Sequence, residues 1–210
     1  REKAALWTDG RYFVQAAIEL ENSGIDLMKE GEEGTPNYID WIISQTPENG
    51  TVAVNAVATS NANWETLVQK LGTKKIKLVD LPLLKDIWSE RSPGAKKNPV
   101  FVHPIERAGK SVSQKLSDIR QKMEEHGASY HIISSLDDVA WTLNLRGSDV
   151  QANPVFLSYI ILSKNEAKLF VDLEKLDTEA RKQMDDSNVK MLPYENFYSE
   201  LKTINGETVL

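Results

Sequence analysis

Histidine is the side chain most often used for acid–base chemistry and metal binding near neutral pH, and this 210-residue sequence contains three. His103 precedes a proline, His126 lies in the last turn of a predicted helix, and His131 lies within a predicted strand. No two of them have the spacing of metal ligands, and no His-Glu-x-x-His motif is present. A cation near a helix C-terminus offsets the helix dipole, which explains His126 without a function. We therefore predict structural roles for all three.

Three pairs of adjacent acidic residues could bind a hard cation by composition alone. The pairs are Glu32-Glu33, Asp137-Asp138 and Asp185-Asp186. Ser135 and Asp138 have the spacing of a capping box, in which Asp138 reaches back to the backbone N–H of Ser135. The other two pairs lie at loop-like positions. The sequence therefore predicts no catalytic residues and no metal ligands within this chain.

The run from Ala108 to Ser111 contains the Gly-Lys-Ser of a phosphate-binding loop. That motif requires a glycine five positions before Gly109, and this chain has Pro104 there. A helix that begins after Ser111 as its N-cap explains these residues better.

Arg11 is the strongest candidate for a binding residue. It follows Asp9-Gly10 at the start of a helix predicted over Arg11 to Leu20. A cation at a helix N-terminus opposes the dipole, so local stability does not favour arginine at this position. A guanidinium can bind a carboxylate or a carbonyl with two hydrogen bonds and keeps its charge. A structural ion pair with a nearby acidic residue is the alternative, and the sequence leaves it open.

Composition excludes several classes of protein. Hydrophobic residues make up 40% of the chain, and its mean hydropathy of −0.41 is typical of a soluble globular protein. The chain lacks cysteine, which excludes disulfides and thiolate chemistry. It carries 25 basic and 31 acidic residues, a net charge of −6, so we predict no nucleic-acid binding. No apolar run approaches the length of a membrane span, and we predict no membrane partner.

Hydrophobic periodicity predicts an α/β domain over residues 1–90. Strands are expected near residues 4–8, 25–28, 51–54 and 76–79, and helices follow the first three at 11–20, from Thr35-Pro36, and at 61–71. Thr35 would be the N-cap and Pro36 the first helical residue. The polar run Arg91–Pro99 is predicted to be a linker.

A second α/β domain is predicted over residues 100–210. Helices are expected at 111–125, 135–143, 178–184 and 194–204, and strands at 130–133, 155–163, 167–172 and 189–192. The second and third of these strands should form an antiparallel hairpin. Gly147 should let the chain turn out of the helix that ends near Leu143. The five tryptophans are predicted to lie in the cores.

Two motifs have a more specific sequence than folding alone requires. The first runs from Leu6 to Ala17 and contains Trp7-Thr8-Asp9-Gly10-Arg11-Tyr12-Phe13. The second runs from Trp141 to Val150 as Trp-Thr-Leu-Asn-Leu-Arg-Gly-Ser-Asp-Val and is followed by Asn153-Pro154-Val155-Phe156. In this order and at about this separation they resemble the first and second domains of the Xaa-Pro aminopeptidase (aminopeptidase P) family, in its long three-domain form.

The resemblance implies two creatinase/prolidase N-terminal-type domains with mixed sheets flanked by helices. The first would lack its start, the second its end, and the catalytic pita-bread domain would be absent. The parent enzyme would be a cytoplasmic homodimer that removes the N-terminal residue from peptides with proline in second position, using two divalent metal ions, usually manganese, held in its catalytic domain. Arg11 would contact the bound peptide, and Arg146 would lie close to the catalytic domain, where we expect an interdomain salt bridge. The fragment alone would shape access to the site and the dimer, and would be inactive.

Two alternatives share this fold. A histone-chaperone type of module has the architecture without the metal site, and prolidase or creatinase has related chemistry. The Gly10-Arg11-Tyr12 turn argues against a module that has no substrate, and the Asn144–Phe156 run matches aminopeptidase P better than prolidase or creatinase.

Overall fold

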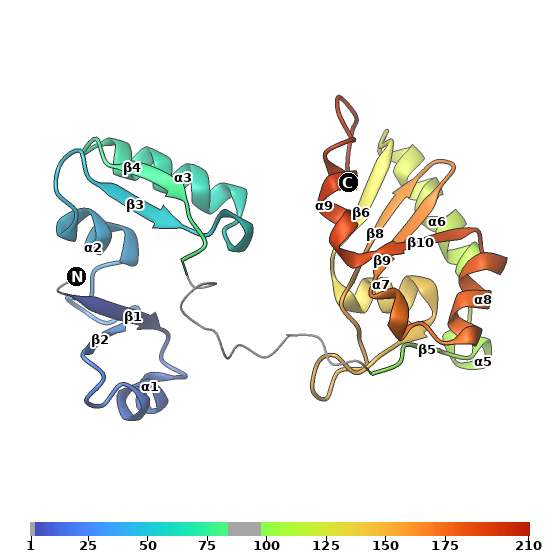
Figure 1. Cartoon of the computed structure of the whole chain (residues 1–210), viewed down its shortest axis with the longest axis horizontal. Helices are drawn as coiled ribbons and strands as arrows, with labels where there is room; N and C mark the ends of the chain where they lie inside the picture. Colours follow the sequence, from blue (N-terminus) through green and yellow to red (C-terminus); the bar gives the residue numbers. More distant parts are fainter. Residues whose placement is uncertain (1–2, 84–97) are drawn as a thin grey trace. The chain divides into compact units, whose positions relative to one another are not determined.

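The computed structural model describes residues 3–83 and 98–210. It divides the chain into two compact units, Arg1–Arg91 and Ser92–Leu210 (Figure 1). Most of the linker predicted at 91–99 lies outside the described residues. Within the described ranges, no helix has the length and apolar character needed to cross a membrane.

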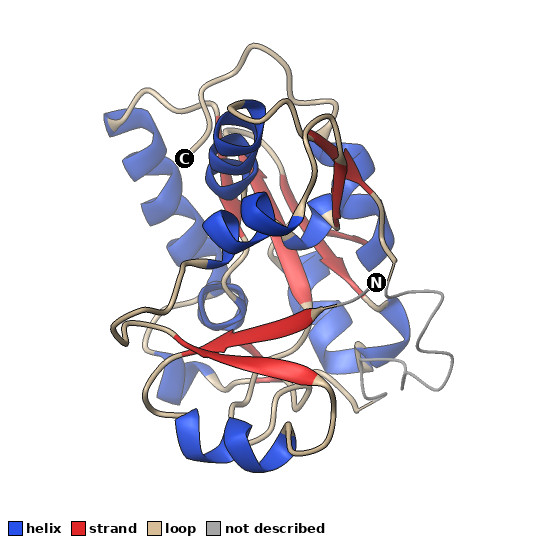
Figure 2. Cartoon of the chain, turned by 90° about the vertical axis from the view of Figure 1, so that its left-hand side faces the viewer, coloured by secondary structure: helices blue, strands red, loops and turns tan. Residues whose placement is uncertain are grey.

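The first unit alternates strands and helices (Figure 1), and Figure 2 distinguishes the helices and strands of the chain by colour. Its elements are β1 (Ala4–Thr8), α1 (Phe13–Glu19), β2 (Ile25–Lys29), α2 (Tyr38–Gln45), β3 (Thr51–Val54), η1 (Ala56–Ala58), α3 (Asn61–Gly72) and β4 (Lys77–Asp80). β1 pairs in parallel with β2, and β3 pairs in parallel with β4, as two separate two-stranded sheets. The buried core of this unit is small and lies around α2, α3 and the β3–β4 sheet. It consists of Ile39, Val52, Leu67, Leu71 and Ile76.

Two helices of this unit begin later than the sequence predicts. The N-cap of α2 is Asn37, whose side chain accepts a hydrogen bond from the Asp40 N–H at 3.0 Å, so the predicted start at Thr35-Pro36 is wrong. The Pro36 carbonyl instead accepts a hydrogen bond from the Trp7 indole at 2.8 Å. α1 begins at Phe13, which leaves Arg11 in the preceding turn rather than in the first helical turn.

The second unit contains a four-stranded mixed sheet. Its elements are β5 (Phe101–Val102), α5 (Ile105–Ala108), α6 (Val112–Glu125), β6 (Tyr130–Ile133), α7 (Leu136–Leu143), β7 (Leu145–Arg146), β8 (Ser158–Ser163), β9 (Ala167–Val171), η2 (Leu173–Lys175), α8 (Thr178–Asp186), β10 (Val189–Pro193), η3 (Tyr194–Asn196) and α9 (Phe197–Leu201). The strand order is β10-β9-β8-β6, with β8 antiparallel to β6 and β9, and β10 parallel to β9. β5 and β7 form a separate antiparallel pair. The α/β fold class and the predicted hairpin are confirmed.

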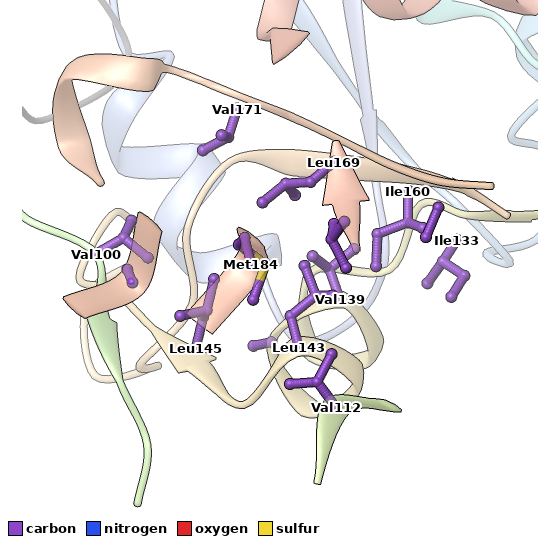
Figure 3. Packing of buried hydrophobic residues seen from close by; sticks show 14 of the residues in the cluster. Val100, Val112, Ile133, Val139, Leu143, Leu145, Ile160, Leu169, Val171 and Met184 are labelled. Atoms are coloured by element: carbon purple, nitrogen blue, oxygen red, sulfur yellow. The ribbon is translucent and has the colours of Figure 1, made fainter. Parts of the chain in front are cut away.

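Alternation along the strands separates two apolar clusters in this unit. Ile160 and Leu169 point into the large core, where they meet side chains of α6, α7 and α8 such as Val112, Leu143 and Met184 (Figure 3). Ile161 and Phe170, one position further along each strand, pack with Phe197 on the opposite face. The sheet is therefore buried on both faces.

Some predicted boundaries and burials in this unit are wrong. The hairpin strand begins at Ser158 rather than Val155, and the last helix is split into η3 and α9. Trp141 is 50% exposed, so it is not a core residue. Trp7, Trp41 and Trp64 are only half-buried, and Trp88 lies outside the described residues. These side chains cover the edges of the cores because their rings are large and carry a polar N–H.

Candidate functional site

The turn between β1 and α1 exposes Arg11. The Arg11 side chain is 80% exposed, and it forms a two-point ion pair with Asp9, from Nε to Oδ1 at 2.9 Å and from Nη2 to Oδ2 at 2.8 Å. The backbone N–H of Arg11 also donates to Asp9 Oδ1 at 3.0 Å. Its guanidinium carbon lies 5.6 Å from the centre of the Tyr12 ring. The turn therefore orients the guanidinium in solvent.

This ion pair sets the electrostatics of the turn. The hydrogen bonds from the Arg11 side chain and backbone lower the pKa of Asp9 from 3.8 to about 2. The hydrogen bond to Asp9 raises the pKa of Arg11, so the pair stays ionised across the physiological range. Both groups are exposed to water, which screens their attraction, so the pair adds little to folding stability.

The geometry contains the ion pair that the alternative interpretation of Arg11 requires. It also leaves Nη1 of the guanidinium without a partner in the described chain, because Asp9 occupies only Nε and Nη2. An arginine held by one edge and open at the other can still bind a carbonyl or a carboxylate.

The second motif begins where α7 ends. Asn144 closes this helix in the left-handed conformation, with φ of 51°. Its side chain accepts a hydrogen bond from the Lys115 ammonium at 2.7 Å and donates one to the Lys110 carbonyl at 2.9 Å. The turn out of the helix is therefore made by Asn144, and the prediction that Gly147 makes it is wrong.

Gly147 has a different role, because its φ is not positive. A Cβ atom at this position would lie 2.7 Å from Cβ of Phe156 and 3.1 Å from the Val155 carbonyl oxygen. The missing side chain lets the motif pack directly against the segment that follows it.

The motif ends at a buried ion pair. Asp149 binds the ammonium of Lys175 with both carboxylate oxygens and accepts the Leu157 N–H at 2.8 Å. The side chains of Asp149 and Lys175 are 1% and 3% exposed. Between the two ends, Arg146 donates from Nη1 to the carbonyls of Ala140 and Leu145, each at 2.8 Å.

Sequence reasoning missed both buried lysines. Lys115 carries a detectable signal, because it lies three residues after Val112 and four before Ile119, on the apolar face of α6. Lys175 lies in the short helix η2, which has too few residues for hydrophobic periodicity to indicate which side chain is buried.

The predicted histidines and acidic pairs stay separate in the structure. Among residues 3–83 and 98–210, no group of three or more His, Asp or Glu side chains could hold a metal ion. His126 is the C-cap of α6, and Nδ1 of His131 lies 3.1 Å from the Leu210 carbonyl oxygen. The Ser135 hydroxyl caps α7 by accepting the Asp138 N–H at 3.4 Å.

The Gly-Lys-Ser run behaves as a helix start. Ser111 and Gln114 form a full capping box at the N-terminus of α6, which confirms the predicted N-cap. Lys110 forms an exposed ion pair with Asp118 at 2.6 Å.

Two hollows lie on the second unit, and Arg146 is not among the residues that line either of them. The larger, of about 690 Å³, is lined by polar side chains of α6 and the β8–β9 turn, such as Arg120, Glu124 and Lys164. The smaller, of about 310 Å³, lies along β6 and α7 and includes His131 and Trp141.

The chain is similar to a family of domains, to several proteins and to a solved structure. The model of the creatinase/prolidase N-terminal domain matches residues 91–210. The chain is 40% identical to a probable Xaa-Pro aminopeptidase P of Arthroderma gypseum, over 96% of its own length and 32% of the relative's. It is 35% identical to a Drosophila melanogaster Xaa-Pro aminopeptidase, over 97% and 34%. The crystal structure of Caenorhabditis elegans X-prolyl aminopeptidase, described as a cytosolic enzyme with a dinuclear active site, superimposes with a TM-score of 0.88 and 31% identity, over 96% of this chain and 33% of that one. The chain thus spans about a third of the length of these relatives.

Proposed function

Because the chain belongs to the creatinase/prolidase N-terminal domain family, we propose that it is the non-catalytic N-terminal portion of a metallo-aminopeptidase. The whole enzyme would release the N-terminal residue from peptides that have proline in second position. One observation carries this proposal: the similarity to Xaa-Pro aminopeptidases runs along almost the entire chain, through both units.

The chemistry would lie outside this chain. The described residues contain no group of three or more His, Asp or Glu side chains that could hold a metal ion, so the two metal ions, which we propose to be manganese, would be held by another part of the enzyme. This chain would instead limit access to the active site to short peptides and form part of a dimer. We further propose a cytoplasmic enzyme, in keeping with the description of the C. elegans relative.

Arg11 is the residue that we propose contacts the peptide. Asp9 fixes the guanidinium through Nε and Nη2, which leaves Nη1 for a substrate carbonyl or carboxylate. An arginine that is already oriented loses less conformational entropy on binding than a free one. We also propose that residues 1–90 and 100–210 are separate domains joined by the segment 91–99.

The test compares this chain with the whole enzyme on two peptides, Arg-Pro-Pro and Arg-Ala-Pro, with added manganese. The whole enzyme should release arginine from the first peptide only, and this chain should release none from either. Hydrolysis of Arg-Ala-Pro at an equal rate would contradict the proposed specificity. Manganese-dependent hydrolysis by this chain alone would contradict the assignment of the chemistry to another part of the enzyme.

A further inference from the structure

In the described part of the chain two lysine side chains are buried, and both bind the six-residue segment Asn144–Asp149. Lys115 binds Asn144 at the start of the Asn144–Asp149 segment, and Lys175 binds Asp149 at its end. Burial of a charge is unfavourable unless the charge is well paired. Two such charges, one at each end of this short segment, indicate that the segment is held in one defined conformation.

The environment of Lys115 is unusual because it contains no carboxylate partner. Its residue exposure is 1%, and its ammonium donates to the Trp141 carbonyl and to Asn144 Oδ1, each at 2.7 Å. The ammonium also lies 4.0 Å from the centre of the Trp141 ring. Burial and the nearby cations Arg146 and Lys110 lower its pKa. Its contacts join the end of α7 to the side chain of Asn144.

The segment between the two lysines has little freedom. Asn144 has a left-handed backbone, Leu145 is fully buried, and Gly147 touches Phe156. Arg146 is the one residue of this segment that carries an unneutralised charge, and its orientation is fixed by the bonds from Nη1 to Ala140 and Leu145. The conformational entropy of this arginine is therefore largely lost before any ligand binds.

The surroundings of Arg146 are cationic, although the chain as a whole carries a net charge of −6. In residues 98–210, neither Arg146 nor Arg107 forms an ion pair, and Nε and Nη2 of Arg146 make no hydrogen bond. Partial burial, together with Arg146, Arg107 and Lys115, lowers the pKa of His103. Phe101 pairs with Arg146 across the β5–β7 ladder and is 47% exposed.

We propose that Arg146, held in place by Lys115 and Lys175, is a carboxylate-binding site for an Asp or Glu side chain of an acidic peptide segment. The Nε and Nη2 edge of the guanidinium matches the two oxygens of a carboxylate. Phe101 offers an apolar surface beside it. The inference does not depend on the proposed peptidase function, because it concerns binding by this chain alone.

The binding test is a titration of the ¹⁵N-labelled chain with N-acetyl-tetraglutamate amide, followed by the Nε–H signal of Arg146 in the unsubstituted chain and by the backbone amide signals of Leu145 and Gly147 in every variant. The signal should shift and saturate, and Arg146→Lys should weaken binding about tenfold, because it keeps the charge but loses the fork. Arg146→Gln should abolish saturable binding. Tetra-alanine with a free C-terminus distinguishes a C-terminal carboxylate from side-chain carboxylates, and equal binding of that peptide would overturn the assignment. A shift reproduced by sodium chloride at equal ionic strength would overturn the site.

A second experiment tests the two lysines as positioning residues. Lys115→Met should weaken tetraglutamate binding about tenfold although Arg146 is intact. Lys110→Met is the matched control, because it removes an exposed cation of the same neighbourhood without altering the contacts of Asn144. An equal loss of affinity in both variants would show that only net charge matters, and would overturn the positioning role.

If Lys115→Met does not fold, the double variant Asp149→Asn, Lys175→Met removes the ion pair at the other end of the segment and should weaken tetraglutamate binding similarly. Unchanged affinity in that folded variant would also overturn the role.

Discussion

The carboxylate of Asp149 and the ammonium of Lys175 form an ion pair that is almost completely removed from solvent. The pair joins the loop before β8 to the short helix after β9, across 26 residues of sequence. Asp149 also accepts the Leu157 N–H, so its two oxygens are satisfied by charge and by hydrogen bonding. The loss of one member leaves the other as a buried, uncompensated charge.

Asp149→Asn should destabilise the second unit by about 3–5 kcal/mol, since Lys175 then stays buried without a counter-charge. Urea unfolding followed on amide signals of residues 98–210 measures the effect. Adding Lys175→Met should restore most of the stability, and Glu48→Gln, which breaks an exposed pair with Lys75 in the first unit, should change little. A loss in Asp149→Asn no larger than in Glu48→Gln would show that the buried pair is unimportant.

Gly147→Ala should destabilise the second unit by about 1–3 kcal/mol, because its Cβ would meet Phe156 and a carbonyl oxygen at sub-contact distances. Gly72→Ala is the control. A Cβ at Gly72 has nothing within 4 Å, and alanine favours a helix by about 0.5–1 kcal/mol over glycine. In thermal unfolding, Gly147→Ala should lower the melting temperature of the second unit, and Gly72→Ala should raise that of the first. Equal changes in melting temperature would contradict the close packing of Gly147.

Asp9 should titrate near pH 2 in the folded chain, as followed by the NMR shift of its carboxyl carbon. Arg11→Gln should raise this pKa towards 3.8, but not completely, because the backbone N–H of residue 11 still donates to Asp9. Since the folded pKa is lowered, the ion pair is present above pH 4 and is lost as the pH falls towards 2. An unchanged Asp9 pKa in Arg11→Gln would mean that the two groups do not pair in solution.

In the whole enzyme, Arg11→Ala should lower kcat/KM for Arg-Pro-Pro about 10- to 150-fold, the loss expected for one charge-assisted hydrogen bond. Metal content and melting temperature should stay the same, because no ligand and no buried contact is removed. Arg11→Lys should restore part of the activity. A lowered melting temperature with near-normal kinetics would instead support a purely structural ion pair with Asp9.

The first unit should self-associate at high concentration. Val14 and Ile18, one turn apart on α1, are 76% and 69% exposed, and each strand of this unit has an unpaired edge in the described chain. Sedimentation equilibrium should show a concentration-dependent mass that Val14→Ser with Ile18→Ser reduces. A monomer at all concentrations would contradict this prediction.

Periodicity located the longer strands and helices, because apolar spacing reports directly which face of an element is buried, but it did not predict the short elements η1, α5, β7 and η2. It failed where side-chain chemistry overrides spacing. The Thr35-Pro36 pair has the residue types of a helix start, yet Asn37 caps α2 because its side chain reaches the Asp40 N–H. Lys115 and Lys175 were missed because a lysine can be buried only through partners distant in sequence, namely Asn144 and Asp149. Trp141 likewise has a contact that is distant in sequence, because the Lys115 ammonium lies 4.0 Å from the centre of its ring.

The unequal cores of the two units have a consequence for hydrogen exchange. The few buried side chains of the first unit, Ala16, Ile39, Val52, Leu67, Leu71 and Ile76, contrast with the several-fold larger cluster around the second sheet. Each unit has its own core, so each can open as its own cooperative block rather than in one global transition. Amides of β1 and β2, strands without a single buried side chain, should exchange first, and those of β8 and β9 last. Cellular proteases that capture transiently opened chain would therefore meet the Arg11 turn long before the Asn144–Asp149 segment.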